Sequence, residues 1–206
     1  MPLRRLPRVT LAVLLRRSLV RQEHPPTALL IRQLAGVRTR GAFTRAEFRS
    51  MCRWKSPRAQ HLWRVNSPAR IAAVSRAVLA CRSERRRMEL LTALRGVGVP
   101  MASAILTLID PRRYGVLDIR AWQLLFAVRS VADNARGQGF TIAQWERYLA
   151  ALRAHARRLH VSARTVEYTL FEIHRQWQRG TLYAPPRTKG AAITRRRRSA
   201  RPRAGT

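Results

Sequence analysis

The chain has 206 residues, of which 46% are hydrophobic, and 42 basic and 10 acidic residues give it a formal net charge of +32. This length and composition predict one folded domain with tails and exclude an intrinsically disordered chain. The charge is not confined to the ends, because residues 23–186 alone carry a net +18. A positive field of this size favours a polyanionic partner, DNA or RNA, and predicts salt-dependent binding.

The sequence lacks the motifs of several other protein classes. Its two cysteines, Cys52 and Cys81, cannot supply the four thiolates of an iron–sulfur cluster, and we expect no structural metal. No nucleotide-triphosphate loop or dinucleotide fingerprint occurs, so we expect no small-molecule cofactor. No segment approaches transmembrane length, so we expect no membrane partner. These features fit a monomer in a reducing cytoplasm, associated with the bacterial nucleoid.

Residues 1–22 carry six arginines and no acid, and we predict a basic, helical segment here. The apolar run 9–15 is too short for a typical signal peptide and ends in Arg16 and Arg17. An acid-free, arginine-rich start is also compatible with an organellar transit peptide. Whether this segment belongs to the fold or directs targeting stays open at this point.

We predict an all-α protein. Cap residues mark many of the helix starts: Thr44 and Glu47 have the form of a capping box, and Ser67 precedes an N1 proline. Ser83, Thr141 and Ser162 are further candidate caps. Caps and apolar spacing together predict helices over 9–22, 27–37, 44–55, 57–65, 68–81, 84–95, 100–109, 119–130, 142–159 and 163–179.

The main domain is expected over 23–183. Its last two helices, 142–159 and 163–179, have the clearest apolar stripes and should pack against each other. From 184 to 206 the chain is rich in arginine, proline and glycine, and we predict a disordered tail. Its run Arg195–Arg198 is compatible with a nucleic-acid tether or with a merely solvated tail.

A helical hairpin over 84–109 is the most informative feature. Gly96 and Gly98 lie between two amphipathic helical patterns, and Pro100 suits the first turn of the second helix. Glycine lets a phosphate approach the backbone, and a helix start offers unpaired N–H groups. The amides of Gly98, Met101 and Ala102 are the predicted phosphate donors.

The hairpin, Leu94 to Ala102, is followed by a hydrophobic helix and then by Val116-Leu117-Asp118 before another helix. This arrangement resembles the helix-hairpin-helix (HhH-GPD) DNA glycosylase superfamily, with its endonuclease III-like fold. The resemblance is specific over about 88–130 and weaker over 25–180. It implies a two-lobed all-helical fold and a flipped base held between the lobes.

The resemblance also implies roles for individual residues. Gly96 and Gly98 match the glycines that hold DNA phosphate, in the family often with a bound monovalent cation at the hairpin. Asp118 matches the catalytic aspartate, which stabilises positive charge on the deoxyribose. The Schiff-base lysine of bifunctional members falls on Pro100, 18 residues before Asp118. The resemblance therefore implies a monofunctional enzyme without lyase chemistry and without an iron–sulfur cluster.

Asp118 has a second interpretation, as the N-cap of the helix that begins at Ile119. Arg112, Arg113 and Arg120 flank the hairpin and the aspartate, and they are either phosphate contacts or ordinary surface charges. A helix cap and a catalytic carboxylate are compatible, because the N–H groups of a helix start favour the ionised form.

Trp54, Trp63 and Tyr114 are candidates for a base-stacking cleft, although aromatic residues at helical spacing commonly belong to a core. Lys55 is one of only two lysines beside forty arginines. A lysine amine acts as a nucleophile once deprotonated, which arginine does not. Lys55 is therefore a candidate cleft residue, and an ordinary surface lysine is the alternative.

The leading hypothesis is a monofunctional DNA N-glycosylase of base excision repair, in which Asp118 serves the hydrolysis of the N-glycosidic bond. The first alternative is a non-catalytic helix-hairpin-helix module that binds the backbone of duplex DNA. The second is an RNA-associated basic protein. The sequence does not disclose a target base.

Overall fold

The computed structural model describes residues 9–178, and within this range every regular element longer than an isolated bridge is a helix. The all-α class is therefore confirmed for this part of the chain. The elements are α1 (Leu11–Arg17), α2 (Pro25–Gln33), α3 (Val37–Arg40), α4 (Arg45–Lys55), the 3-10 turn η1 (Pro57–Ala59), α5 (Gln60–Trp63), α6 (Pro68–Ala80), α7 (Glu84–Thr92), α8 (Val99–Ile109), α9 (Ile119–Ala127), α10 (Ile142–Leu159) and α11 (Ala163–Trp177).

Caps start these helices where the sequence predicts them. Thr44 and Glu47 form the reciprocal capping box of α4. The side chains of Ser67, Ser83 and Ser162 each accept a hydrogen bond from the amide three residues ahead. Each cap satisfies a backbone donor that has no partner inside its helix, so these boundaries are set locally.

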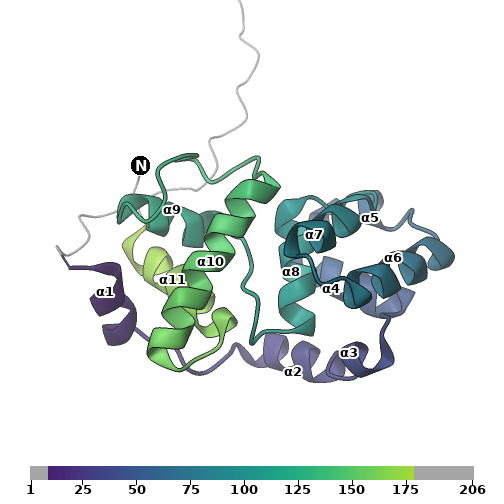
Figure 1. Ribbon diagram of the computed structural model, residues 1–206, viewed down its shortest axis with the longest axis horizontal. Helices are drawn as coiled ribbons and strands as arrows, with labels where there is room; N and C mark the ends of the chain where they lie inside the picture. The colour runs from purple at the N-terminus through teal and green to yellow at the C-terminus, as the bar shows by residue number, and fades with distance from the viewer. Residues whose placement is uncertain (1–8, 179–206) are drawn as a thin grey trace, which may run out of the picture.

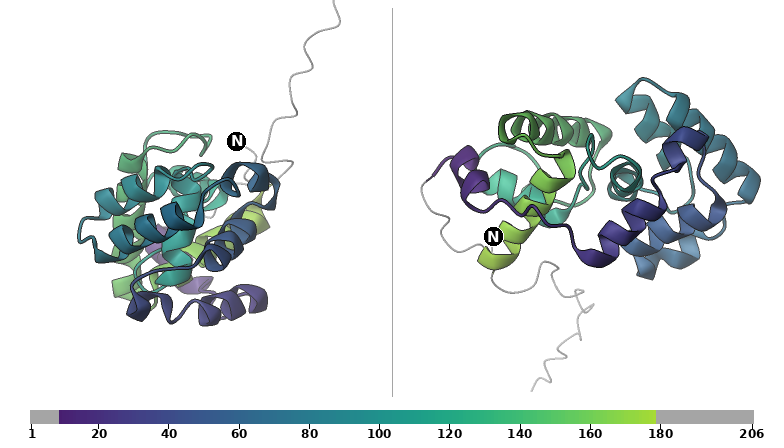
Figure 2. Two further views of the ribbon diagram at one scale, coloured as in Figure 1. Left: turned by 90° about the vertical axis from the view of Figure 1, so that its right-hand side faces the viewer. Right: turned by 90° about the horizontal axis from the view of Figure 1, so that it is seen from below.

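The helices lie in two groups (Figure 1). One contains α1, α9, α10 and α11, the other contains α4 to α7, and α8 lies between them. The view from below shows the same two groups (Figure 2). Within and between these groups, α9 and α10 pack on α11, α6 packs on α7, and α4 packs on α8. The chain passes from α8 to α9 through the extended residues 114–117.

The central helix α8 is buried from Met101 to its end at Ile109. A helix that is buried on all sides needs neighbours on all sides, and α8 has partners in both groups. Its first turn, by contrast, is less deeply buried at Val99 and Pro100. The hairpin end of α8 is thus the end from which backbone groups reach solvent.

Several expected boundaries are wrong. α1 ends at Arg17 rather than at residue 22, and the helix expected over 27–37 is divided into α2 and α3. α9 ends at Ala127 because Arg129 adopts a positive φ of 58°, which no α-helix continues.

The described part of the N-terminal segment is packed onto the domain. Leu11, Leu14 and Leu15 are buried, α1 contacts α11, and the Val20 amide donates to Thr169 Oγ1 at 3.1 Å. α1 therefore belongs to the fold. Two expectations lie outside the described residues: the helical character of residues 1–8 and the disorder of the tail 184–206.

Candidate functional site

The two hairpin glycines differ in backbone conformation and in the space around them. Gly96 has a φ of +74°, and a Cβ placed on it would lie 2.7 Å from both Leu62 Cβ and Trp63 N. Gly98 has an ordinary φ of −83°, and the nearest atom to its Cβ position is Pro100 Cδ at 3.9 Å. The fold requires glycine at position 96, whereas position 98 leaves open space toward solvent.

Asn66, a residue that sequence analysis did not single out, stabilises the hairpin turn through hydrogen bonds to its backbone. Its side-chain oxygen accepts the amide of Arg95 at 3.0 Å, and its side-chain nitrogen donates to the carbonyl of Arg95 at 2.9 Å. Asn66 is 3% exposed. A buried amide group bound on both sides holds the turn in one conformation.

The amides available at the start of α8 differ from the predicted set. The Ala102 N–H donates to the Gly98 carbonyl at 2.9 Å, so Ala102 is wrong as a phosphate donor. Pro100 has no N–H. Helix geometry leaves the amides of Val99 and Met101 without an intrahelical acceptor. Val99 thus takes the place expected for Ala102.

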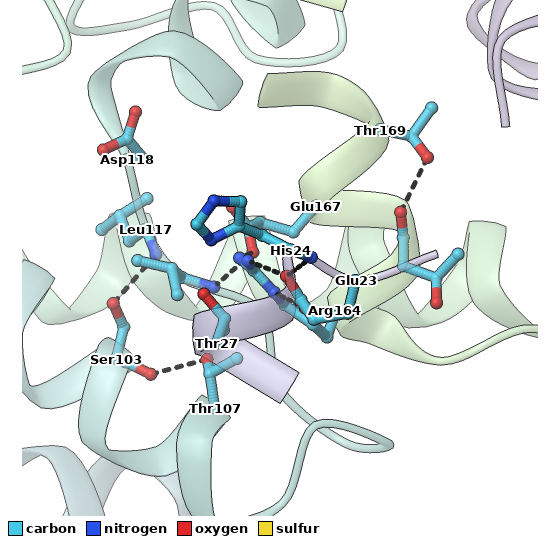
Figure 3. Close-up of polar contacts among 12 residues, drawn as sticks. Glu23, His24, Thr27, Ser103, Thr107, Leu117, Asp118, Arg164, Glu167 and Thr169 are labelled. Carbon is cyan, nitrogen blue, oxygen red and sulfur yellow. Dashed lines mark hydrogen bonds and ion pairs between the residues drawn. The ribbon is translucent and has the colours of Figure 1, made fainter. Parts of the chain in front are cut away.

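Two buried side chains fix the extended approach to Asp118. The Leu117 amide donates to Ser103 Oγ at 2.9 Å, and the Val116 carbonyl accepts the Tyr148 hydroxyl at 2.8 Å. Figure 3 shows the bond from Ser103 to Leu117 beside Asp118. Because α8 supplies Ser103 and α10 supplies Tyr148, both helices position the aspartate.

The two carboxylate oxygens of Asp118 have separate partners. Oδ1 accepts the Arg120 amide at 2.9 Å, which makes Asp118 the N-cap of α9. Oδ2 lies 3.0 Å from Lys55 Nζ. Burial raises the pKa of Asp118, but the Lys55 ammonium and the Arg120 amide lower it more, so the net pKa is below its usual value. Asp118 is ionised at neutral pH.

The partner of Asp118 is unusual for this chain. Each of the ten acidic residues, all within the described range, belongs to an ion pair. In every pair except that of Asp118 the cation is an arginine. Lys55 is the last residue of α4 and Asp118 precedes α9, so this pair links the two groups of helices.

Two cavities flank the Lys55–Asp118 pair, and both residues line both cavities. The first, the hairpin cavity, has a volume of about 540 Å³. Its wall contains Gly96, Gly98, Pro100 and Met101 from the hairpin, Arg58 from η1, and residues 137–140. It therefore brings the hairpin, the aspartate and two cations to one depression.

The second, the aromatic cavity, has a volume of about 460 Å³ and is lined by side chains that include Trp54, Tyr168 and Phe171. In its wall, Arg164 binds both carboxylate oxygens of Glu23, at 2.7 and 2.9 Å. The Arg164 guanidinium also pairs with Glu167 (Figure 3). It lies over the Trp54 and Tyr168 rings.

Of the predicted cleft residues, Lys55 and Trp54 line the cavities beside Asp118, and Trp63 and Tyr114 do not. Trp63 is fully buried and donates its ring N–H to the Ser56 carbonyl. Tyr114 is 4% exposed, and its hydroxyl donates to Glu84 at 2.7 Å. Within the described residues, Trp63 and Tyr114 line neither large cavity, so their interpretation as stacking residues at this site is wrong.

Of the three flanking arginines, two lie away from the hairpin and one lies near the aspartate. Arg112 and Arg113 follow the far end of α8, whose 11 residues span roughly 16 Å from the hairpin. They border a different depression together with Arg153 and Arg157. They therefore do not line the hairpin cavity, and their role as phosphate contacts stays a prediction.

Arg120 remains near the aspartate. It lies two residues from Asp118, and its guanidinium lies over the Phe171 ring at 5.3 Å and donates to the Gln178 side chain. Its charge helps to lower the pKa of Asp118.

Comparison of the chain with protein-family models, curated proteins and solved structures found no match. Among residues 9–178, no three His, Cys, Asp or Glu side chains gather as metal ligands. No helix in the same range is both long and apolar enough to cross a membrane. The monovalent cation implied at the hairpin stays a prediction.

Proposed function

We propose that this chain binds duplex DNA and hydrolyses the N-glycosidic bond of a flipped base. One observation carries the proposal: the ionised Asp118 lies in the same cavity as the hairpin glycines Gly96 and Gly98. An N-glycosidic bond breaks through a transition state with positive charge on the sugar, and a fixed anion stabilises that charge.

In this proposal the hairpin cavity receives the sugar–phosphate backbone. The amides of Gly98, Val99 and Met101 are the donors for a phosphate at the start of α8, where the helix dipole adds a favourable field. Arg58 and Lys55 add positive charge to the same wall. Phosphate contacts of this kind fix the position of the DNA and do not select a base.

The flipped base would occupy the aromatic cavity, on the other side of Asp118. Trp54, Tyr168 and Phe171 offer ring faces for stacking, and stacking recognises any base to some degree. The ion pairs of Arg164 hold the wall between Trp54 and Tyr168 in place. Asp118 would then lie at the glycosidic bond between base and sugar.

The proposal is tested with duplexes that carry an array of damaged and mismatched bases, followed by alkaline cleavage at abasic sites. We expect strand cleavage for at least one modified duplex and none for the matched unmodified duplex. Binding of every duplex without release of any base would contradict glycosylase activity.

The Lys55–Asp118 pair favours a second candidate, a non-catalytic DNA-binding module. An aspartate that caps α9 and joins it to α4 already has a structural role. In that case the hairpin binds DNA, and Asp118 only connects the two groups of helices. Base release separates the two candidates, because both predict DNA binding.

A further inference from the structure

We propose that Lys55 is an amine nucleophile that forms a Schiff base with abasic deoxyribose, so that the chain also cleaves DNA at abasic sites. The resemblance implies no lyase chemistry, because Pro100 occupies the usual lysine position of the hairpin. Pro100 removes an amine from that one position only. The structure brings an amine to the aspartate from α4 instead.

The identity of Lys55 is the first observation. In a chain with forty arginines and two lysines, the ion-pair partner of Asp118 is the one lysine of the described range. Arginine would serve equally well for an ion pair and better for a phosphate contact. It cannot replace an amine that must lose its proton and attack a carbon atom.

The position of Lys55 is the second observation. Its side chain is 18% exposed and lines both cavities, so the amine borders the space proposed for the sugar and the space proposed for the base. Its Nζ lies 3.0 Å from Asp118 Oδ2, within the range for direct proton transfer. An abasic deoxyribose in the hairpin cavity would present its C1′ aldehyde between them.

The chemistry balances without a further reagent. The Lys55 ammonium gives one proton to Asp118, and the Nζ lone pair forms a bond to C1′ of the open-chain sugar. Asp118 returns that proton to the C1′ oxygen to give a carbinolamine, then takes a second proton from Nζ and passes it to the same oxygen. That oxygen leaves as water when the Nζ lone pair forms the C=N bond, and a protonated imine remains. Loss of a C2′ proton to solvent then expels the 3′ phosphate by breakage of the C3′–O bond. Hydrolysis of the imine restores Lys55.

This inference rests on the proposed function only in that the same cleft must admit a DNA sugar. The test therefore uses a duplex with one preformed abasic site, which requires no base recognition. The full chain is incubated with this duplex and sodium borohydride, which reduces an imine to a stable amine. A duplex with a tetrahydrofuran site, which has no aldehyde, measures binding separately.

We expect a covalent protein–DNA adduct, mapped by proteolysis and mass spectrometry to Lys55. Lys55→Arg keeps the ion pair and should bind the tetrahydrofuran duplex normally, but it should form no adduct and cleave no strand. Lys189→Arg is the matched control and should form the adduct as the wild type does.

An adduct that persists in Lys55→Arg, or that maps to Lys189 or the N-terminal amine, would overturn the inference. So would a wild-type protein that binds the tetrahydrofuran duplex and yields no adduct on the abasic one. Failure to bind either duplex would instead contradict the proposed function, and the inference with it.

Discussion

Gly96 and Leu62 are in such close approach that a Cβ on the glycine would lie 2.7 Å from the leucine Cβ. The backbone of Gly96 also has a φ of +74°. Gly96→Ala should therefore lower the free energy of unfolding by about 2 kcal/mol or more, measured by urea denaturation. An unfolding midpoint equal to that of the wild type would mean that the turn is not held as described.

Gly98 allows the complementary test, because space is open around its Cβ position. Gly98→Ala should cost about 1 kcal/mol or less, as for an altered N-cap. Gly98→Leu should place its side chain in the hairpin cavity and weaken duplex binding at physiological salt about tenfold. Unchanged affinity in Gly98→Leu would indicate that DNA binds elsewhere on this basic chain.

Ser103 should affect catalysis without touching the substrate, because it holds the Leu117 amide next to Asp118. Ser103→Ala leaves that buried amide without its acceptor, and we expect a loss of about 1–3 kcal/mol in stability together with slower base release. Ser75→Ala is the matched control, since Ser75 is equally buried and bonds to carbonyls of Ala72 and Phe43. Equal effects of the two variants on base release would contradict a positioning role for Ser103.

His174 should make the stability depend on pH. It is fully buried, and its Nε2 lies 3.0 Å from the Gln123 side-chain oxygen. Burial and the nearby charge of Arg120 lower the pKa of His174 to about 4. The unfolded chain takes up this proton near pH 6.5, so stability is present above that pH and decreases as the pH falls toward 4.

The free energy of unfolding should therefore fall more steeply with decreasing pH in the wild type than in His174→Gln, by at most about 1.4 kcal/mol per pH unit. Urea unfolding at pH 7, 6, 5 and 4 measures it. Parallel profiles of the two proteins would show that His174 does not titrate on unfolding.

The sequence predicts most of the helix starts, because a cap acts within one turn of chain. Thr44 with Glu47 and the cap Ser67 are examples. Helix ends were less predictable. The end of α9 depends on the positive φ of Arg129, for which an arginine gives no local signal.

The candidate site was predictable only in part, because only some of its residues are close together in the sequence. Gly96, Gly98 and Asp118 lie in one segment and could be recognised together. Lys55 lies 63 residues from Asp118, and the burial of Trp63 and Tyr114 depends on helices that are remote in sequence. The second cavity is built by side chains from α2, α4 and α11, which no local pattern connects.

The central claim is that Asp118 is a catalytic carboxylate, and Asp118→Asn tests it most directly. Asparagine caps a helix about as well as aspartate does, so the variant keeps the acceptor for the Arg120 amide and removes the charge. The measurement is the single-turnover rate of base release from the best duplex of the array, with duplex affinity and thermal unfolding as controls. We expect the rate to fall about 100-fold or more at unchanged affinity. Base release by Asp118→Asn at the wild-type rate would contradict the account.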